Sequence, residues 1–436
     1  MKQVFQIAWS GAASLLVSSA CASAPVVSDV TMTQDANRKV LVTYRLDAPA
    51  VVTLDVETNV VGTAEWVSIG GENLTHVTGE ANVFVRETDS STVHAIQWQP
   101  TVAWPNHRIR GEGVRAVVRA WAPEAPPDWM LIDLSMPSNV HYYASMAELP
   151  FGHPTNVAYK TTKLLMRKVQ AAGRTFRMGI SYGEARQDFN GGGDFADVYG
   201  LASPRLVSFT NDYYLAVFPF TQSQFFNALG ENPSEYDTGK APPYDECPTT
   251  SYSYDRLRGN GNGILVSPVA DWPNDGHAVE PNSRFDKVRQ RTGVEVDLPT
   301  EAQWEYACRA GEERFRYDGA ALHSAPGLED LCWYNATATD GKMRPVGLKR
   351  PNAWGFYDMY GNGLEWCLDW FSYGYRDCGT LEPVGPASGV KRVARGKQVT
   401  SDSRYMNSVY REGYDPCGYN GFSPFTFRFA APAVAR

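Results

Sequence analysis

Short runs of alternating and β-branched apolar residues dominate the first quarter of the chain. Such runs cover residues 39–46, 50–56 and 113–121, and turn-forming residues at 70–73 and 87–91 separate them. A period of two residues with frequent turns is typical of β-strands, and no helical period of useful length interrupts it. The pattern predicts an all-β sandwich of the immunoglobulin or fibronectin type over residues 25–125.

The pattern changes after the proline-rich segment at residues 123–127. Residues 126–156 are mixed in character, and we expect them to form a linker. A new strand is predicted over residues 159–167, where apolar and polar positions again alternate in part. The rest of the chain is rich in loops and has few helical patterns, which predicts a second domain over residues 157–433.

Three short helices are predicted in this second region. Thr221 and Thr300 each stand three residues before a glutamine, which is the spacing of a capping box at a helix N-terminus. A third helix is predicted over residues 284–291. Each of these helices has a stop signal, since a glycine can adopt the left-handed conformation that ends a helix. The three glycines are Gly230, Gly311 and Gly293.

Composition narrows the class of protein. The 436 residues contain 43% hydrophobic and 20% charged residues, which is typical of a globular protein. The net charge of −8 argues against a protein that follows a nucleic-acid backbone. After the N-terminal segment, no run approaches the roughly 20 apolar residues that a membrane-spanning helix needs. We therefore expect a protein with no nucleic-acid partner and no membrane span.

The N-terminus has the pattern of an export signal. Lys2 is followed by an apolar and small-residue stretch over residues 4–20, and Ala20 and Ala22 flank Cys21 as in a signal-peptidase site. Residues 1–22 are therefore predicted to be a signal peptide. The protein is expected to be secreted, periplasmic or part of the cell envelope, and lipidation of Cys21 remains an alternative to simple cleavage.

The cysteines are concentrated in the second region. An even number of cysteines in an oxidising compartment predicts disulfides, but the sequence does not choose among the possible pairings. The six cysteines after Cys21 are Cys247, Cys308, Cys332, Cys367, Cys378 and Cys417.

Two long motifs give the second region a resemblance to a known family. Residues 298–311 have the sequence LPTEAQWEYACRAG, and residues 350–366 have the sequence RPNAWGFYDMYGNGLEW. With weaker blocks at 393–396 and 427–430, they resemble the formylglycine-generating (sulfatase-modifying factor) family over roughly residues 157–433. The resemblance implies a loop-rich mixed α/β domain related to C-type lectins, and hence an α+β protein with an N-terminal sandwich.

The resemblance also raises the question of copper. Active members of the family oxidise a cysteine to formylglycine with a copper ion held by two cysteines shortly after an Arg-Gly-Gly segment. In this chain Arg395 and Gly396 match that segment, and Ser401 and Met406 stand where the two cysteines would be. A hydroxyl and a thioether do not replace two thiolates as copper(I) ligands, so the sequence argues against copper. Cys417 lies 16 residues beyond Ser401 and would need a different loop path.

A structural calcium ion is the cofactor that the resemblance favours. Two carboxylates and two backbone carbonyls in one glycine-rich turn suit a hard cation. The residues that match the family's calcium positions are Asp358, Gly361, Gly363 and Glu365. A second calcium site maps more weakly onto Asn335, Ala336 and Asp340.

These observations favour an exported protein whose second domain acts as a binding or interaction module. The ligand class stays open among a glycan, a peptide and another exported protein. The alternative is an enzyme, either a formylglycine-generating oxidase with a displaced centre that involves Cys417 or another oxidoreductase on the same scaffold. A structural component of the envelope is a third possibility.

Overall fold

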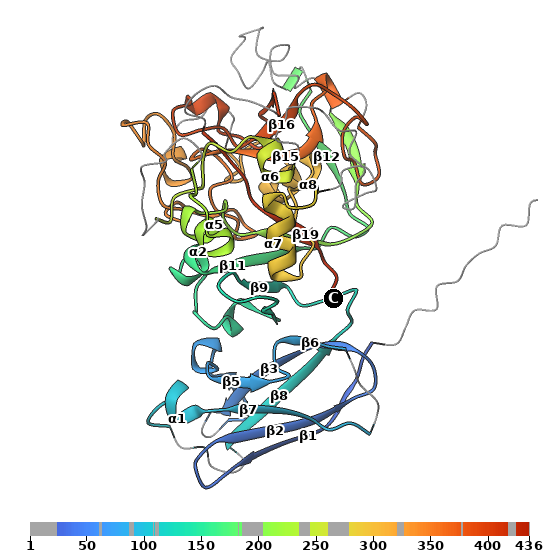
Figure 1. The fold of residues 1–436 in the computed structure, drawn as a ribbon, viewed down its shortest axis with the longest axis vertical. Coiled ribbons are helices and arrows are strands. Elements are labelled where there is room, and N and C mark those ends of the chain that lie inside the picture. Colours follow the sequence, from blue (N-terminus) through green and yellow to red (C-terminus); the bar gives the residue numbers. More distant parts are fainter. Residues whose placement is uncertain are drawn as a thin grey trace, which may run out of the picture.

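The protein has a β-sandwich at one end and a larger, loop-rich domain at the other (Figure 1). The predicted signal peptide, Cys21 and Cys417 lie outside the described residues. The computed structural model describes residues 24–60, 63–86, 91–107, 109, 113–181, 183–184, 204–234, 245–259, 279–320, 327–375, 378–416 and 424–435.

The predicted sandwich is confirmed as two antiparallel sheets. The first sheet has the order β1-β2-β7-β5. In the second sheet β3 pairs with β4 and β6 and also with β8. Alternate residues of β2 and β7 are buried between the sheets, as a period of two requires. The strands are β1 (Val27–Gln34), β2 (Val40–Leu46), β3 (Ala50–Asn59), β4 (Trp66–Ser68), β5 (Val77–Gly79), β6 (Val83–Val85), β7 (His94–Trp98) and β8 (Val114–Trp121), with a short helix α1 (Pro100–Ala103) and the 3₁₀ turn η1 (Gly71–Asn73).

The segment 126–156 is not the linker that the sequence predicts. It contributes β9 (Trp129–Asp133) and β10 (Val140–Tyr143) to a five-stranded antiparallel sheet of the order β10-β9-β11-β14-β19. All five residues of β9 are buried, because the strand pairs on both edges and is covered on both faces. The other strands are β11 (Lys163–Val169), β14 (Tyr213–Ala216) and β19 (Ala430–Pro432).

The strand predicted over residues 159–167 begins later than expected. Residues Ala158–Thr161 form the short helix α2, and β11 starts at Lys163. A second, four-stranded sheet has the order β17-β16-β15-β18, and a hairpin pairs β12 with β13. These strands are β12 (Thr175–Met178), β13 (Arg205–Ser208), β15 (Leu364–Trp370), β16 (Arg392–Arg395), β17 (Arg411–Tyr414) and β18 (Phe425–Thr426).

The three predicted helices are confirmed. Both capping boxes form, with the threonine side chain accepting from the glutamine N–H and the glutamine side chain accepting from the threonine N–H. The third helix ends at Gly293 as predicted, whereas α8 ends one residue early, at Ala310 in the left-handed conformation. The helices of the second domain are α2, α5 (Gln222–Leu229), α6 (Tyr254–Arg258), α7 (Arg284–Thr292) and α8 (Glu301–Arg309), with 3₁₀ turns η3 (Met146–Glu148), η4 (Leu328–Asp330), η5 (Tyr373–Tyr375) and η6 (Ser403–Tyr405). Within the described ranges, we find no helix with the length and apolar character that crossing a bilayer requires.

The two domains are packed directly against each other. Val51 of β3 belongs to the same apolar core as Met130 of β9 and Tyr142 of β10. Across the junction the Tyr142 N–H donates to the Asn82 carbonyl at 2.7 Å, and the Ala435 N–H donates to the Pro123 carbonyl at 2.8 Å. The sandwich is therefore docked on the second domain through a shared core.

No disulfide joins any of the cysteines in the described part of the chain, contrary to the sequence expectation. Cys308, Cys332, Cys367 and Cys378 are buried thiols in one apolar core that also contains Met359 and Tyr360. They fill that core as small apolar side chains.

Burial makes these thiols unreactive. It raises the pKa of Cys378 to about 12 and raises the pKa values of Cys308, Cys332 and Cys367 further. Because the thiolate is the reactive form, iodoacetamide should label none of the four in the folded protein and all four in urea. Peptide mapping by mass spectrometry tests this. Rapid labelling of Cys308 in the folded protein, or its recovery in a disulfide-linked peptide pair, would contradict the observed packing.

Candidate functional site

A buried ion network fixes the loop on which the family's copper residues would stand. Glu301 and Glu305 project from successive turns of α8, and both are fully buried. Glu301 accepts from Arg411 at 2.6 Å and from Arg395 at 3.1 Å. Glu305 accepts from Arg395 at 2.7 Å and from Arg309 at 2.8 Å. The network thus joins the first family motif, in α8, to β16 and β17.

Two further hydrogen bonds connect the network to the backbone, whereas the Nε of Arg395 has no hydrogen-bond partner among the described residues. The Gly179 N–H donates to Glu305 at 2.8 Å, and the Arg411 guanidinium donates to the Ser372 carbonyl at 2.6 Å. Burial alone would raise the pKa of Glu305, but Arg309 and Arg395 hold it below its ordinary value. Glu305 therefore stays ionised, and it serves the scaffold rather than proton transfer.

Asp369 of β15 is the exception among these carboxyl groups. Its side chain accepts the Glu301 N–H at 2.7 Å. Burial and the nearby negative charge of Glu301 raise its pKa to about 8. Asp369 is therefore protonated in the folded protein at neutral pH.

The loop after β16 is held in one conformation by Arg395. Its guanidinium donates to the Ser408 carbonyl at 2.6 Å, while the Asn407 side chain accepts the Tyr410 N–H at 2.8 Å. Ser401 lies in this loop, and its carbonyl accepts the Asn335 N–H at 3.0 Å. Met406 is fully buried in the core that contains the four thiols. The two residues that the sequence comparison predicts at the copper positions thus lie in a hydrogen-bonded loop, and one of them points into the core.

The sequence analysis did not identify one group of polar contacts on the same loop, which is centred on a lysine. Lys397 occupies the second glycine position of the Arg-Gly-Gly segment and adopts φ +64°, a conformation that disfavours side chains. Its ammonium donates to Glu412 at 2.6 Å and to the Tyr410 hydroxyl at 2.8 Å, and it lies 5.2 Å from the ring centroid of Tyr405. The signal in the sequence was a lysine where the family has glycine.

The four predicted calcium residues do not form an open oxygen site. Both Glu365 oxygens are occupied, because the buried Arg428 donates to them at 2.6 and 2.7 Å and Trp304 donates at 2.8 Å. Asp358 accepts the Gly347 N–H at 2.7 Å, and burial raises its pKa to about 6. A calcium ion would have to displace the Arg428 guanidinium from Glu365, so these residues do not fit the ion.

The glycines of this turn have a different role. At Gly361, φ is +68°, and a Cβ would lie 2.1 Å from the Trp333 carbonyl oxygen. The Gly361 N–H donates to the Gly396 carbonyl at 2.7 Å. At Gly363 a Cβ would lie 2.5 Å from the Thr426 side chain. Both glycines allow backbone and side chains to approach closely, which explains their presence without a metal.

The weaker calcium site is also occupied by protein contacts. Asp340 is exposed and pairs with Arg344 at 2.7 Å. Asn335 and Ala336 are exposed in the same turn region. Across the described ranges, no group of three or more His, Cys, Asp or Glu side chains is arranged to hold a metal ion.

The elevated pKa of Asp369 predicts a pH dependence of stability. An unfolded aspartate has a pKa of 3.8, so between about pH 4 and pH 8 the folded state binds the proton more tightly than the unfolded state. The free energy of unfolding should therefore fall as the pH rises through this range. Asp369→Asn should make that fall shallower, although Asp358 retains a smaller effect in the same direction. Urea unfolding of the wild type and the variant from pH 5 to pH 8 measures this change in the free energy of unfolding. An Asp369→Asn slope equal to that of the exposed control Asp330→Asn would refute the assignment.

The contacts of Glu365 predict that calcium does not bind at this turn. Bound calcium would raise the midpoint of thermal unfolding by several degrees at saturating concentration. We expect calcium and EDTA to leave the midpoint unchanged within about 1 °C. A calcium-dependent rise in the wild type that disappears in Asp358→Asn would show that Glu365 is released from Arg428.

Comparison with known proteins places this domain in a family. A serine/threonine-protein kinase pkn1 of Chlamydia caviae is 29% identical over 228 residues, which cover 51% of this chain and 33% of that protein. A formylglycine-generating enzyme of Streptomyces coelicolor is 41% identical over 121 residues, which cover 25% of this chain and 38% of that protein. The chain thus spans about a third of the length of these relatives. Among solved structures, PvdO from Pseudomonas aeruginosa aligns with a TM-score of 0.46 and 18% identity, over 62% of this chain and 94% of that chain.

The family match covers the described site almost completely. Residues 160–427, more than half of the chain, match the family described as sulfatase-modifying factor enzyme 1-like domain. They include α8, the turn at Asp358 and the loop that carries Ser401 and Met406. The chain therefore belongs to the sulfatase-modifying factor family, with a mixed α/β, C-type-lectin-like domain that follows a β-sandwich.

Proposed function

We propose that this chain is an exported protein whose C-terminal domain binds a protein, peptide or glycan and does not oxidise it. The observation that carries the proposal is the nature of the two residues at the copper positions. Ser401 offers a hydroxyl, which is a poor copper(I) ligand, and the thioether of Met406 has no exposed surface. A copper centre that also accepts a substrate thiol needs two thiolates at an accessible place.

The four thiols of the core around Met359 give no alternative copper pair. Burial raises the pKa of Cys308, Cys332, Cys367 and Cys378, so all four are protonated at neutral pH. Cys417 lies outside the described residues. A displaced oxidase centre that involves Cys417 is the alternative that the experiment must separate.

The loop itself supports a binding role. Arg395 and Asn407 hold its backbone in one conformation, which reduces the conformational entropy that binding would cost. Its exposed side carries the ion pair of Asp402 and Arg404 at 3.0 Å. Relatives of this domain carry the names of a kinase and of a formylglycine-generating enzyme, and membership of the family alone sets no activity.

The deciding experiment is turnover of a sulfatase-type peptide that contains one cysteine, with copper and oxygen supplied and an active formylglycine-generating enzyme run alongside. We expect no aldehyde by mass spectrometry and no copper retained after dialysis. Conversion of the peptide by the wild type and its loss in Cys417→Ser would overturn the proposal and establish the displaced centre.

The binding role is tested on peptide and glycan arrays with three proteins. Ligands of the wild type should be lost or weakened about tenfold in Arg404→Ala, because a charged contact at a rigid surface contributes roughly 1.5 kcal/mol or more. They should be kept in Lys391→Ala, which changes an exposed cation at the other end of β16. Blank arrays with folded wild-type protein, or equal losses in both variants, would count against a binding loop.

A further inference from the structure

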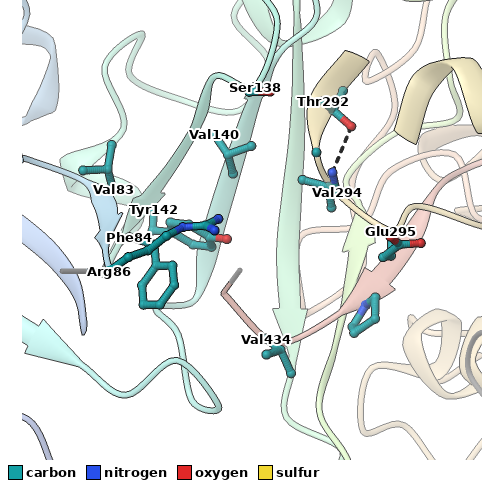
Figure 2. A pocket seen from close by; sticks show the side chains of 12 residues that line it. Val83, Phe84, Arg86, Ser138, Val140, Tyr142, Thr292, Val294, Glu295 and Val434 are labelled. Atoms are coloured by element: carbon teal, nitrogen blue, oxygen red, sulfur yellow. Dashed lines mark hydrogen bonds between the residues drawn. The ribbon is translucent and has the colours of Figure 1, made fainter. Parts of the chain in front are cut away.

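A cavity of about 310 Å³ lies where the sandwich meets the second domain (Figure 2). Its lining comes from β6 and its end, from β10, from the segment after α7 and from the C-terminal segment after β19. Ligand pockets occur preferentially at domain boundaries of this kind. The cavity is separate from the loop that carries Ser401 and Met406, so its role does not depend on the proposed function of that loop.

The charges around this cavity are unbalanced. Arg86 is exposed, and among the described residues its guanidinium forms no hydrogen bond or ion pair and only lies 5.4 Å from the Phe84 ring centroid. The other charged residue of the lining, Glu295, pairs with Arg289 at 3.2 Å. The cavity therefore has one uncompensated positive charge in a chain with a net charge of −8.

A second donor lies next to that charge. Figure 2 shows Arg86 and Tyr142 on the same side of the cavity, with Glu295 on the opposite side. The positive charge of Arg86 acts on the Tyr142 phenol, although burial has the larger effect and raises its pKa to about 12. The Tyr142 hydroxyl thus stays protonated, and it donates to no other described residue. A guanidinium and a phenol that line the same side of one cavity can both donate to a single carboxylate.

Six other residues of the lining are apolar, while Ser138, Thr292 and Glu295 add polar groups. Its volume corresponds to about ten water molecules at roughly 30 Å³ each, enough for a branched or aromatic side chain with its carboxylate. The apolar part of the lining consists of Val83, Phe84, Val140, Val294, Pro432 and Val434.

We propose that this junction cavity binds a carboxylate attached to a small apolar body, with the carboxylate on Arg86 and Tyr142 and the apolar body against the valines. Either a free short-chain acid or the C-terminal residue of a peptide has this chemistry. Because the walls come from both domains, the bound ligand adds contacts across their junction. It should therefore stabilise the docking of the sandwich.

The test is calorimetric titration of the full chain with matched probes. 4-Methylpentanoate and 3-phenylpropanoate should bind saturably in about the millimolar range, whereas the corresponding amides should bind at least tenfold more weakly. Leucine-ended peptides with a free or an amidated C-terminus separate the two sources. Preference for the free acid identifies a small-molecule site, and preference for the free-carboxyl peptide identifies a peptide-end site. Equal binding of acids and amides would overturn the proposal.

Three variants locate the site. Arg86→Gln should weaken acid binding at least tenfold, and Tyr142→Phe, which removes only the hydroxyl, should weaken it about threefold. Arg38→Gln in the β1–β2 turn should leave it unchanged. Since Arg86 is exposed and without an ion pair, its variant should fold, which a wild-type circular dichroism spectrum verifies. No acid binding by the wild type, or unchanged binding in Arg86→Gln, would overturn the assignment.

Discussion

The buried ion network around Arg395 is the interaction on which the second domain depends. Glu301 and Glu305 lie on α8, whereas Arg395 and Arg411 lie about 90 to 110 positions later in the chain. All four side chains are fully buried, and the free energy lost on their desolvation is offset only if every contact forms together. A helix of nine residues, two strands and a loop are thereby held in one arrangement with few regular elements.

Arg428 holds the second motif, residues 350–366, in place through similar buried contacts. Its guanidinium pairs with Glu365 and also donates to the Tyr357 carbonyl at 3.0 Å, so the turn at Asp358 is fixed from the last part of the chain. The most recognisable acidic residues of both motifs, Glu301 and Glu365, thus serve the scaffold. Neither residue depends on Ser401 or Met406 for its contacts.

What the sequence predicted correctly was encoded locally. The sandwich strands follow from a period of two, and α5 and α8 follow from capping boxes that span only four residues. The sequence did not predict β9, because that strand pairs with β11, which lies about 30 or more residues later in the chain. It also did not predict the helix at the start of the segment 159–167, because four residues are too few for alternation to distinguish a helix from a strand. Nor could the sequence show that Glu365, a predicted calcium ligand, pairs with Arg428, 63 residues further on. Contacts between residues so far apart in the chain produce no periodic pattern in the sequence.

The junction between the domains has a consequence for how the molecule acts. A sandwich on a linker would be an independent module, with its own contacts and its own motions. Here Val51 shares a core with Met130, and backbone hydrogen bonds join Tyr142 to Asn82 and Ala435 to Pro123 across the boundary. Opening the junction would expose this apolar surface and break these bonds, so the two domains move as one unit. The cavity at this junction is therefore lined by residues of both domains, with Arg86 contributed from the sandwich side.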